Sequence, residues 1–211
     1  MNEHEITYRG PNAFDKIKSV KICVCGVGAL GSNLVNILVR QGAENITIID
    51  MDRVEAKNIA TQIYTSKDVG QKKVNATKSL VYQSTKKVLN VIDKEVKQNN
   101  ASKLLKGFDL IVDVFDNWEG RKILKKVSDK LNIPCVHAGM SDDGFAEIKW
   151  NKYYKIPLIE TKQNDICDYP LAANLVHMTV AVLSEVIVQF VVNDEYVNKE
   201  ITLKDISVHK I

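Results

Sequence analysis

Three glycines at fixed spacings could hold a phosphate group. Gly26, Gly28 and Gly31 form the pattern G-x-G-x-x-G within CVCGVGALGSNL, residues 23–34. An apolar run precedes the pattern and helical spacing follows it. The first glycine then permits a tight turn, the second lets a phosphate approach the backbone, and the third packs helix against strand. The helix N-terminus adds free N–H groups and a positive dipole end. The pattern predicts nucleotide binding and fits NAD and ATP equally.

Asp50 ends the next predicted strand, where a carboxylate can accept hydrogen bonds from the ribose hydroxyls of NAD or ATP alike. Three further features favour ATP over NAD. The polar loop 51–70 is long, whereas a dehydrogenase would turn directly into a helix. Lys73 begins the following helix, an unfavourable place for a cation unless it serves an anion. Asp116 ends another predicted strand, and a carboxylate beside phosphates requires a cation between them. We therefore expect Asp116 to bind Mg²⁺ and the ligand to be a polyphosphate.

The elements that must position these residues alternate along the chain. Apolar runs predict strands at 20–26, 45–50, 88–93, 109–116 and 133–140. Helical spacing predicts helices at 29–41, 71–87, 101–107 and 118–131. This alternation is typical of a parallel sheet with right-handed crossovers. Ligands bind such sheets outside the carboxyl ends of the strands, so Gly28, Asp50 and Asp116 should face one crevice.

The pattern changes after Gly144. Residues 145–150 resemble a strand, 151–170 are irregular, 171–192 form a long apolar helix, and 200–211 alternate like a strand. We predict a Rossmann-like α/β fold, with a mostly parallel sheet, helices on both faces and an antiparallel C-terminal extension. No linker or repeat interrupts the 211 residues, so one domain spanning 1–211 is expected.

An ordered set of motifs resembles the ThiF/MoeB/HesA superfamily, the adenylating domain shared with ubiquitin-activating enzymes. The motifs are GVGALG, IIDMDRVEAKN, the Gln62 position, DVGQKK, DVFDN and IPCVHAG, in family order over about residues 15–192. The resemblance implies that MgATP adenylates the C-terminal carboxylate of a small ubiquitin-like or sulfur-carrier protein and releases pyrophosphate. It implies catalytic roles for Asp116 and Lys73. It implies nucleotide contacts for Gly26, Gly28, Ala29, Gly31, Asp50, Asp52, Asn58, Gln62, Lys73, Asp116 and Asn117.

The sequence departs from the family pattern in two places. The element N-x-x-R-Q contains Thr61 where arginine is expected. That arginine would neutralise phosphate charge, so Arg53, Lys57 or the Arg9 of a partner chain would have to substitute. The paired zinc cysteines are missing, and we expect no zinc. A catalytically weakened scaffold that needs a partner subunit is the alternative, and an NAD(P)-dependent oxidoreductase is a third possibility.

Four other residues have a functional and a structural interpretation. Some family members carry an acyl-accepting cysteine at the place of Cys167, although a small apolar role fits as well. His137 ends a strand and is expected to be a hydrogen-bonded structural residue. Asp109 and Asp113 flank another predicted strand, and both are also expected to be structural.

Composition narrows the class of protein. The chain is 45% hydrophobic and 26% charged, as in soluble globular proteins. Its net charge of +3 comes from basic residues spread along the chain, which argues against a nucleic-acid surface. Few cysteines, no Cys-x-x-Cys pair and no apolar run at the N-terminus favour a reduced cytoplasmic protein.

The helix at 171–192 is long enough to span a membrane. Helical spacing predicts that its polar residues lie on one stripe, and Glu185 would be costly in lipid. A buried helix or a homodimer interface is therefore expected rather than a membrane span. The residues of the stripe are Asn174, His177, Ser184, Glu185 and Gln189.

Overall fold

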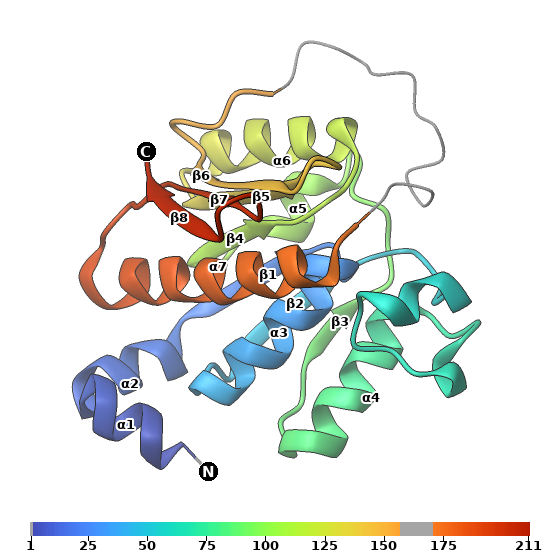
Figure 1. Cartoon of the computed structure of the whole chain (residues 1–211), viewed down its shortest axis with the longest axis horizontal. Helices are drawn as coiled ribbons and strands as arrows, with labels where there is room; N and C mark the ends of the chain where they lie inside the picture. The colour runs from blue at the N-terminus through green and yellow to red at the C-terminus, as the bar shows by residue number, and fades with distance from the viewer. Residues whose placement is uncertain (1, 157–170) are drawn as a thin grey trace.

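A single mixed sheet organises the chain, as the computed structural model of residues 2–156 and 171–211 shows (Figure 1). Its order is β3-β2-β1-β4-β5-β6-β7-β8. Strands β3 to β5 in this order pair in parallel, and β5 to β8 pair antiparallel. The strands are β1 (Lys21–Cys25), β2 (Asn45–Ile49), β3 (Asn90–Ile92), β4 (Leu110–Asp113), β5 (Cys135–Met140), β6 (Phe145–Trp150), β7 (Lys199–Thr202) and β8 (Ser207–Lys210). The predicted fold class is confirmed.

Helices cover both faces of the sheet (Figure 1). On one face lie α3 (Ala29–Gln41), α4 (Lys73–Thr85) and α7 (Ala173–Asn193). On the other face lie α5 (Ala101–Leu105) and α6 (Trp118–Leu131). Strand β1 is buried on both sides because its residues alternate between the two cores, Ile22 and Val24 facing α3 and α7, Cys23 and Cys25 facing α6.

The structure corrects several predicted boundaries. Strand β4 ends at Asp113, so Asp116 lies in the following loop rather than at the end of the strand. The C-terminal tail is a hairpin of two strands, because the chain turns between β7 and β8 with Ile206 at a φ of 55°. Two 3-10 helices, η1 (Ala56–Ala60) and η2 (Ser66–Asp68), lie in the loop predicted as irregular.

Two N-terminal helices were not predicted. Helix α1 (Glu3–Arg9) and helix α2 (Pro11–Ser19) precede β1. A signal for α2 is present in the sequence, because Gly10 is followed by Pro11 in the first turn, where proline is favoured. Helix α2 packs against α7 and contributes Ile17 to the core.

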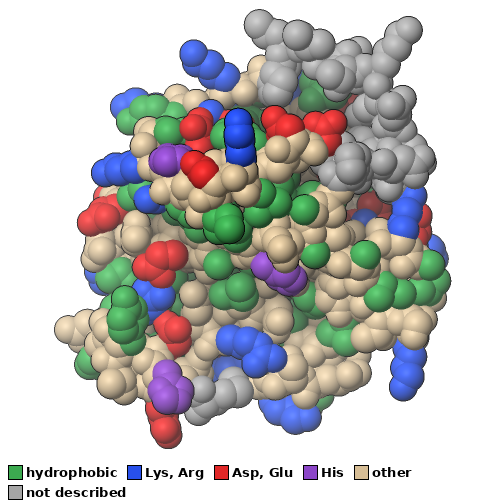
Figure 2. Space-filling view, in the orientation of Figure 1, with side chains coloured by type: hydrophobic (Ala, Val, Ile, Leu, Met, Phe, Trp, Pro, Cys, Tyr) green, Lys and Arg blue, Asp and Glu red, His purple; other side chains and the backbone are tan. Residues whose placement is uncertain are grey.

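Helix α7 packs along the sheet beside α3. Its length and mean hydropathy of 2.0 would suit a membrane span, and half of that stretch is buried within the chain. The predicted polar stripe is wrong for Ser184, which is buried and donates to the carbonyl of Ala181. Figure 2 shows hydrophobic side chains gathered in the middle of this face, where α7 crosses the molecule in Figure 1.

Candidate functional site

Three loops meet at the carboxyl edge of the parallel strands. Cys25 at the end of β1 pairs with Ile49 of β2 and with Asp113 of β4. The Gly26 amide donates to the Ile49 carbonyl at 2.9 Å, and the Val114 amide donates to the Cys25 carbonyl at 3.1 Å. The glycine turn, the residues after β2 and the residues after β4 therefore lie together, as the sequence predicted.

The glycines of the turn differ in the space around them. Gly26 has a φ of 97°, and a side chain there would also meet the backbone of Val114 at 3.0 Å. A Cβ on Gly31 would lie 1.9 Å from the Gly26 carbonyl oxygen, so only glycine lets α3 approach the turn. At Gly28 a Cβ would meet nothing within 4 Å. Gly28 is the N-cap of α3 and has no side chain to accept from the first-turn N–H groups, which remain available to a ligand.

The side chain of Asp50 binds the backbone of the glycine turn. Its Oδ2 accepts from the Val27 amide and its Oδ1 accepts from the Asp52 amide, both at 2.8 Å. Burial raises the pKa of this carboxyl group, against the opposing field of Lys73. The structure thus gives Asp50 a structural contact with the glycine turn, and its predicted contact with ribose stays a prediction.

Lys73 is the first residue of α4 and is buried near the turn. Its Nζ lies 3.0 Å from Oδ2 of Asp52, whose side chain is 52% exposed. Burial acts to lower the pKa of Lys73, but the carboxylates of Asp50, Asp52 and Asp116 outweigh it and raise the pKa. Lys73 is therefore a charged lysine whose ion-pair partner is half exposed, and a phosphate could replace that partner.

The family element after Asp52 packs against the start of α3. Asn33 of α3 donates to the Thr61 carbonyl at 2.9 Å. Asn58 is buried and its Oδ1 accepts from the Glu55 amide, so it shapes η1. The Oε1 of Gln62 is buried and has no hydrogen-bond partner within residues 2–156 and 171–211. Gln62 follows Thr61, whose carbonyl is bound by Asn33 near the start of α3. An unpaired buried acceptor in this segment fits a ligand such as a nucleotide.

Tyr64 is a site residue that the sequence analysis missed. Its hydroxyl donates to the Val27 carbonyl of the glycine turn at 2.7 Å and lies 3.0 Å from Oγ1 of Thr77 in α4. The side chain is 3% exposed. Tyr64 therefore connects the glycine turn to the helix that carries Lys73. A lone tyrosine within a polar loop was the only signal for this role.

Asp116 is exposed, and its negative charge acts on two cations, Lys73 and Arg121. This charge helps to raise the pKa of Lys73. Burial acts to lower the pKa of Arg121, but the charge of Asp113, helped by that of Asp116, raises it. The neighbouring Asn117 is the N-cap of α6, and its side chain accepts from the Gly120 amide at 2.7 Å. Its predicted contact with the nucleotide remains a prediction.

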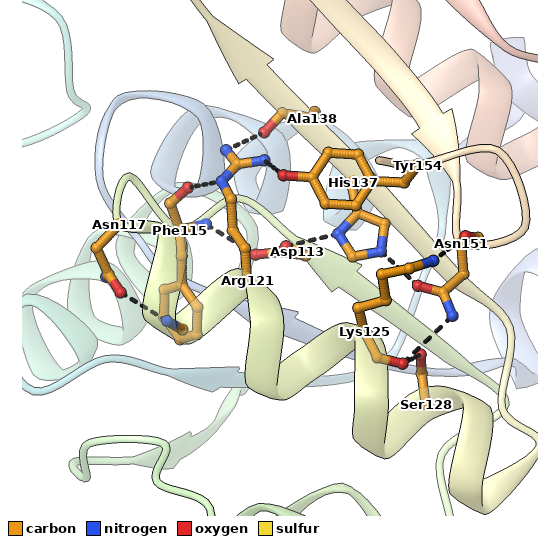
Figure 3. Close-up of polar contacts among 11 residues, drawn as sticks. Asp113, Phe115, Asn117, Arg121, Lys125, Ser128, His137, Ala138, Asn151 and Tyr154 are labelled. Atoms are coloured by element: carbon orange, nitrogen blue, oxygen red, sulfur yellow. Dashed lines mark hydrogen bonds and ion pairs between the residues drawn. The ribbon is translucent and has the colours of Figure 1, made fainter. Parts of the chain in front are cut away.

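A buried polar network supports the loop of Asp116 (Figure 3). Nδ1 of His137 lies 2.6 Å from Oδ2 of Asp113, and Nε2 lies 2.7 Å from Oδ1 of Asn151. Both residues at the centre, Asp113 and His137, are fully buried. The ring of Tyr154 stacks on His137 with centroids 4.0 Å apart. His137 is thus hydrogen-bonded on both sides and has no exposed atom for chemistry, in agreement with the structural role expected for it.

Other predicted residues are engaged elsewhere or lie outside the description. Cys167 falls in the segment 157–170, outside the described residues. Arg9 forms a double hydrogen bond with Glu185 of its own chain, at 3.2 and 2.7 Å. The side chain of Arg9 is 12% exposed. Arg53 donates to the Gly70 carbonyl, and Lys57 lies 3.3 Å from Glu55. Asp109 accepts from the Lys21 amide at 2.8 Å, a structural contact.

The donors for a metal are sparse at this edge. Within the described residues no three His, Cys, Asp or Glu side chains form a group that could hold an ion. Mg²⁺ is commonly held by one or two carboxylates together with substrate phosphates, so the exposed Asp116 is compatible with that ion.

A cleft of about 450 Å³ opens beyond the carboxyl end of β5. Its lining residues are Ser141, Asp142, Gly144, Leu171, Ala172 and Leu175.

Comparison with known proteins finds a family model and curated relatives. Residues 3–191 match the model of the ThiF family. The chain is 31% identical over 134 residues to the sulfur carrier protein adenylyltransferase of Thermus thermophilus, covering 60% of this chain and 48% of that protein. It is 30% identical over 139 residues to SUMO-activating enzyme subunit 2 of Dictyostelium discoideum, covering 64% of this chain and 21% of that protein.

Solved structures show the same fold. The structure of Escherichia coli MccB with ATP superposes with a TM-score of 0.80 at 18% identity, covering 99% of this chain and 69% of that one. The chain spans about half the length of the Thermus relative and a fifth of the Dictyostelium relative. The family match nevertheless extends over most of the chain and includes each loop of the site. The chain belongs to the ThiF family.

Proposed function

We propose that this chain uses MgATP to adenylate the C-terminal carboxylate of a small ubiquitin-like or sulfur-carrier protein, releasing pyrophosphate. The observation that carries the proposal is the meeting of the glycine turn, Lys73 and Asp116 at one sheet edge. Adenylyltransferase relatives in the same family support the reaction class. The domain boundary 1–211, the cytoplasmic location and the homodimer belong to the same proposal.

Each residue of the site has a task in this reaction. The first turn of α3 and the open backbone at Gly28 bind phosphate oxygens, because the N–H groups and the helix dipole favour an anion there. Lys73 leaves Asp52 and places its charge on the phosphates. Gln62 offers its unpaired Oε1 to a donor group of the nucleotide. Asp116 would hold Mg²⁺, which would supply positive charge beside the phosphates.

The reaction then depends on positioning and electrostatics. A carboxylate oxygen of the carrier forms a bond to the α-phosphorus, and the bond from that phosphorus to the bridging oxygen breaks, so pyrophosphate leaves with the bonding pair. The cleft beyond β5 would guide the last residues of the carrier toward the α-phosphate. Fixed charges around the phosphorus account for rate in such transfers, because they need no reorganisation during the step.

A weakened scaffold is the second candidate, and Thr61 is the observation that favours it. Thr61 directs its carbonyl to Asn33 and supplies no charge. Arg53, Lys57 and Arg9 are each engaged in contacts within the chain. As a scaffold, the chain would bind nucleotide and depend on another subunit for the missing charge.

Two measurements test the proposal against its rivals. Calorimetric titration should show Mg²⁺-dependent ATP binding and no binding of NAD at equal concentration. The opposite ranking would support an oxidoreductase. ATP–pyrophosphate exchange with a carrier protein ending in Gly-Gly should then be detected. ATP binding without exchange across verified carriers would favour the scaffold.

A further inference from the structure

We propose that Arg121 positions Asp116 for the reaction, acting through the backbone of Phe115. This inference rests on the proposed function. Arg121 lies in the first half of α6 and forms no part of the predicted nucleotide contacts. Its head group lies beside the loop that carries Asp116, and Figure 3 shows it among the residues of the buried network.

The peptide groups on both sides of Phe115 are held by the network. Its amide donates to Oδ1 of Asp113 at 3.1 Å, and its carbonyl accepts from Nε of Arg121 at 2.7 Å. The residue after Asp116 is fixed as well, because Asn117 caps α6. Asp116 itself is exposed, and its side chain forms no hydrogen bond or ion pair within residues 2–156 and 171–211. Its carboxylate therefore projects from a backbone that is fixed before and after it.

Arg121 connects this loop to the rigid sheet. Besides Phe115, it donates from Nη2 to the Ala138 carbonyl of β5 at 2.7 Å and from Nη1 to the Tyr154 hydroxyl at 3.4 Å. A planar guanidinium can direct several donors at once in fixed directions, which a lysine ammonium on a flexible stem cannot do. Arg121 thus sets the distance between the Asp116 loop and the end of β5, beside the cleft proposed for the carrier.

Stability alone does not account for such a group. A buried or partly buried charge network is often no more stable than well-packed apolar residues of the same volume, because desolvation offsets the attraction. Here Asp113, His137 and Arg121 occupy a place that apolar side chains could fill. Precision of placement is what the network adds, and a misplacement of about 1 Å at a reacting centre can cost on the order of a hundredfold in rate.

The test compares Arg121→Lys with Lys125→Met in the full chain. Lys125 lies one turn along α6 and donates to the Asn151 carbonyl, at the end of the network away from Asp116. Arg121→Lys should lower kcat of ATP–pyrophosphate exchange by roughly thirtyfold or more while KM for ATP stays within about threefold. Lys125→Met should leave kcat within about twofold of the wild type.

Amide hydrogen exchange gives a readout that does not require activity. In Arg121→Lys the amides of Phe115 and Asp116 should exchange at least about tenfold faster, with those of α3 unchanged. If Arg121→Lys fails to fold, Tyr154→Phe removes one anchor of the guanidinium and keeps the ring on His137. It should produce the same changes, at about threefold to tenfold in kcat.

The outcomes separate the two proposals. Wild-type kcat and wild-type exchange of the Phe115 and Asp116 amides in Arg121→Lys would overturn the role of Arg121. An equal loss of kcat in Lys125→Met would overturn it too, because general loosening would then explain the effect. If the wild type itself catalyses no exchange with a verified carrier, the proposed reaction fails, and the amide measurement still decides whether Arg121 fixes the backbone of Asp116.

Discussion

Single residues at the glycine turn have distinct tasks although they look alike in the sequence. Gly31 is required by packing, because a Cβ would lie 1.9 Å from a backbone oxygen. Gly28 has free space around it and a negative φ, so its lack of a side chain does not serve the fold. The space at Gly28 is what a phosphate would use.

Alanine at Gly28 should therefore affect ATP binding, whereas alanine at Gly31 should affect stability. Gly28→Ala should keep the melting temperature within a few degrees yet weaken ATP binding by about tenfold or more, because a methyl group fills the phosphate space. Gly31→Ala should lower the free energy of unfolding by about 2–3 kcal/mol. Calorimetry and chemical denaturation measure the two effects. Unchanged ATP affinity in Gly28→Ala would show that phosphate does not approach this backbone.

Truncation of His137 tests how costly it is to leave the buried Asp113 carboxylate without this partner. His137→Ala removes the partner of a fully buried Asp113 carboxylate and leaves an acceptor of Asn151 unpaired. It should cost about 3–5 kcal/mol in unfolding free energy. The matched control is Lys149→Ala, which lies opposite His137 on β6 and loses only a surface ion pair with Glu147, worth about 1 kcal/mol or less. Equal losses in the two variants would show that breaking the buried pair leaves no costly unpaired charge.

At the scale of elements, the loop from Asp52 to Lys72 is a connector between the glycine turn and α4. Tyr64 makes the contact at its centre through Val27 and Thr77. The loop therefore couples the position of Lys73 to the shape of the phosphate site. Because these bonds join residues distant in sequence, propensities along the chain could not reveal them.

Removing one hydroxyl tests this connection. Tyr64→Phe should lower stability by about 1–2 kcal/mol and weaken ATP binding several-fold, because the Val27 carbonyl loses its donor. Tyr82 of α4 is 49% exposed, so Tyr82→Phe is a matched control that should change stability by less than about 0.5 kcal/mol. ATP affinity that stays at the wild-type value in Tyr64→Phe would separate the loop from the nucleotide site.

The order and type of most elements could be predicted, because periodic apolar patterns report local structure. Helices at 29–41 and 118–131 match α3 and α6 at both ends. Strand β4 is shorter than its apolar run, because its pairing with β1 and its pairing with β5 both end at Asp113, and Phe115 and Asp116 lie beyond them. The charged Asp113 within that run, and His137 within another, were the only local signs of the buried network. Its partners on α6 and after β6 are set by tertiary packing.

For the whole molecule, one sheet edge collects the proposed chemistry and one face carries α7. Half of the most apolar stretch of α7 is buried against the sheet and α3. The remaining side is partly apolar, with Met178, Ala181 and Val182 at least partly exposed. Arg9 on α1 is bound to Glu185 on that helix, so the N-terminal helices are part of the same face.

A homodimer would cover this face. Light scattering should give about twice the 23.7 kDa mass of the chain at micromolar concentration. Met178→Glu, which places a charge on the proposed interface, should shift the mass to that of one chain, whereas Lys126→Glu on the opposite face of the sheet should not. A monomeric wild type at micromolar concentration would remove the dimer from the proposal.

The most direct test of the central claim is ATP–pyrophosphate exchange with a Gly-Gly-ending carrier, comparing wild type and Asp116→Ala. The wild type should exchange in a Mg²⁺-dependent way. Asp116→Ala should keep much of its ATP affinity, since the glycine turn and Lys73 remain, and lose about a hundredfold or more in exchange rate, as removal of one preorganised electrostatic group does. An equally active Asp116→Ala would contradict the account, and so would a wild type that binds ATP but shows no exchange with any verified carrier.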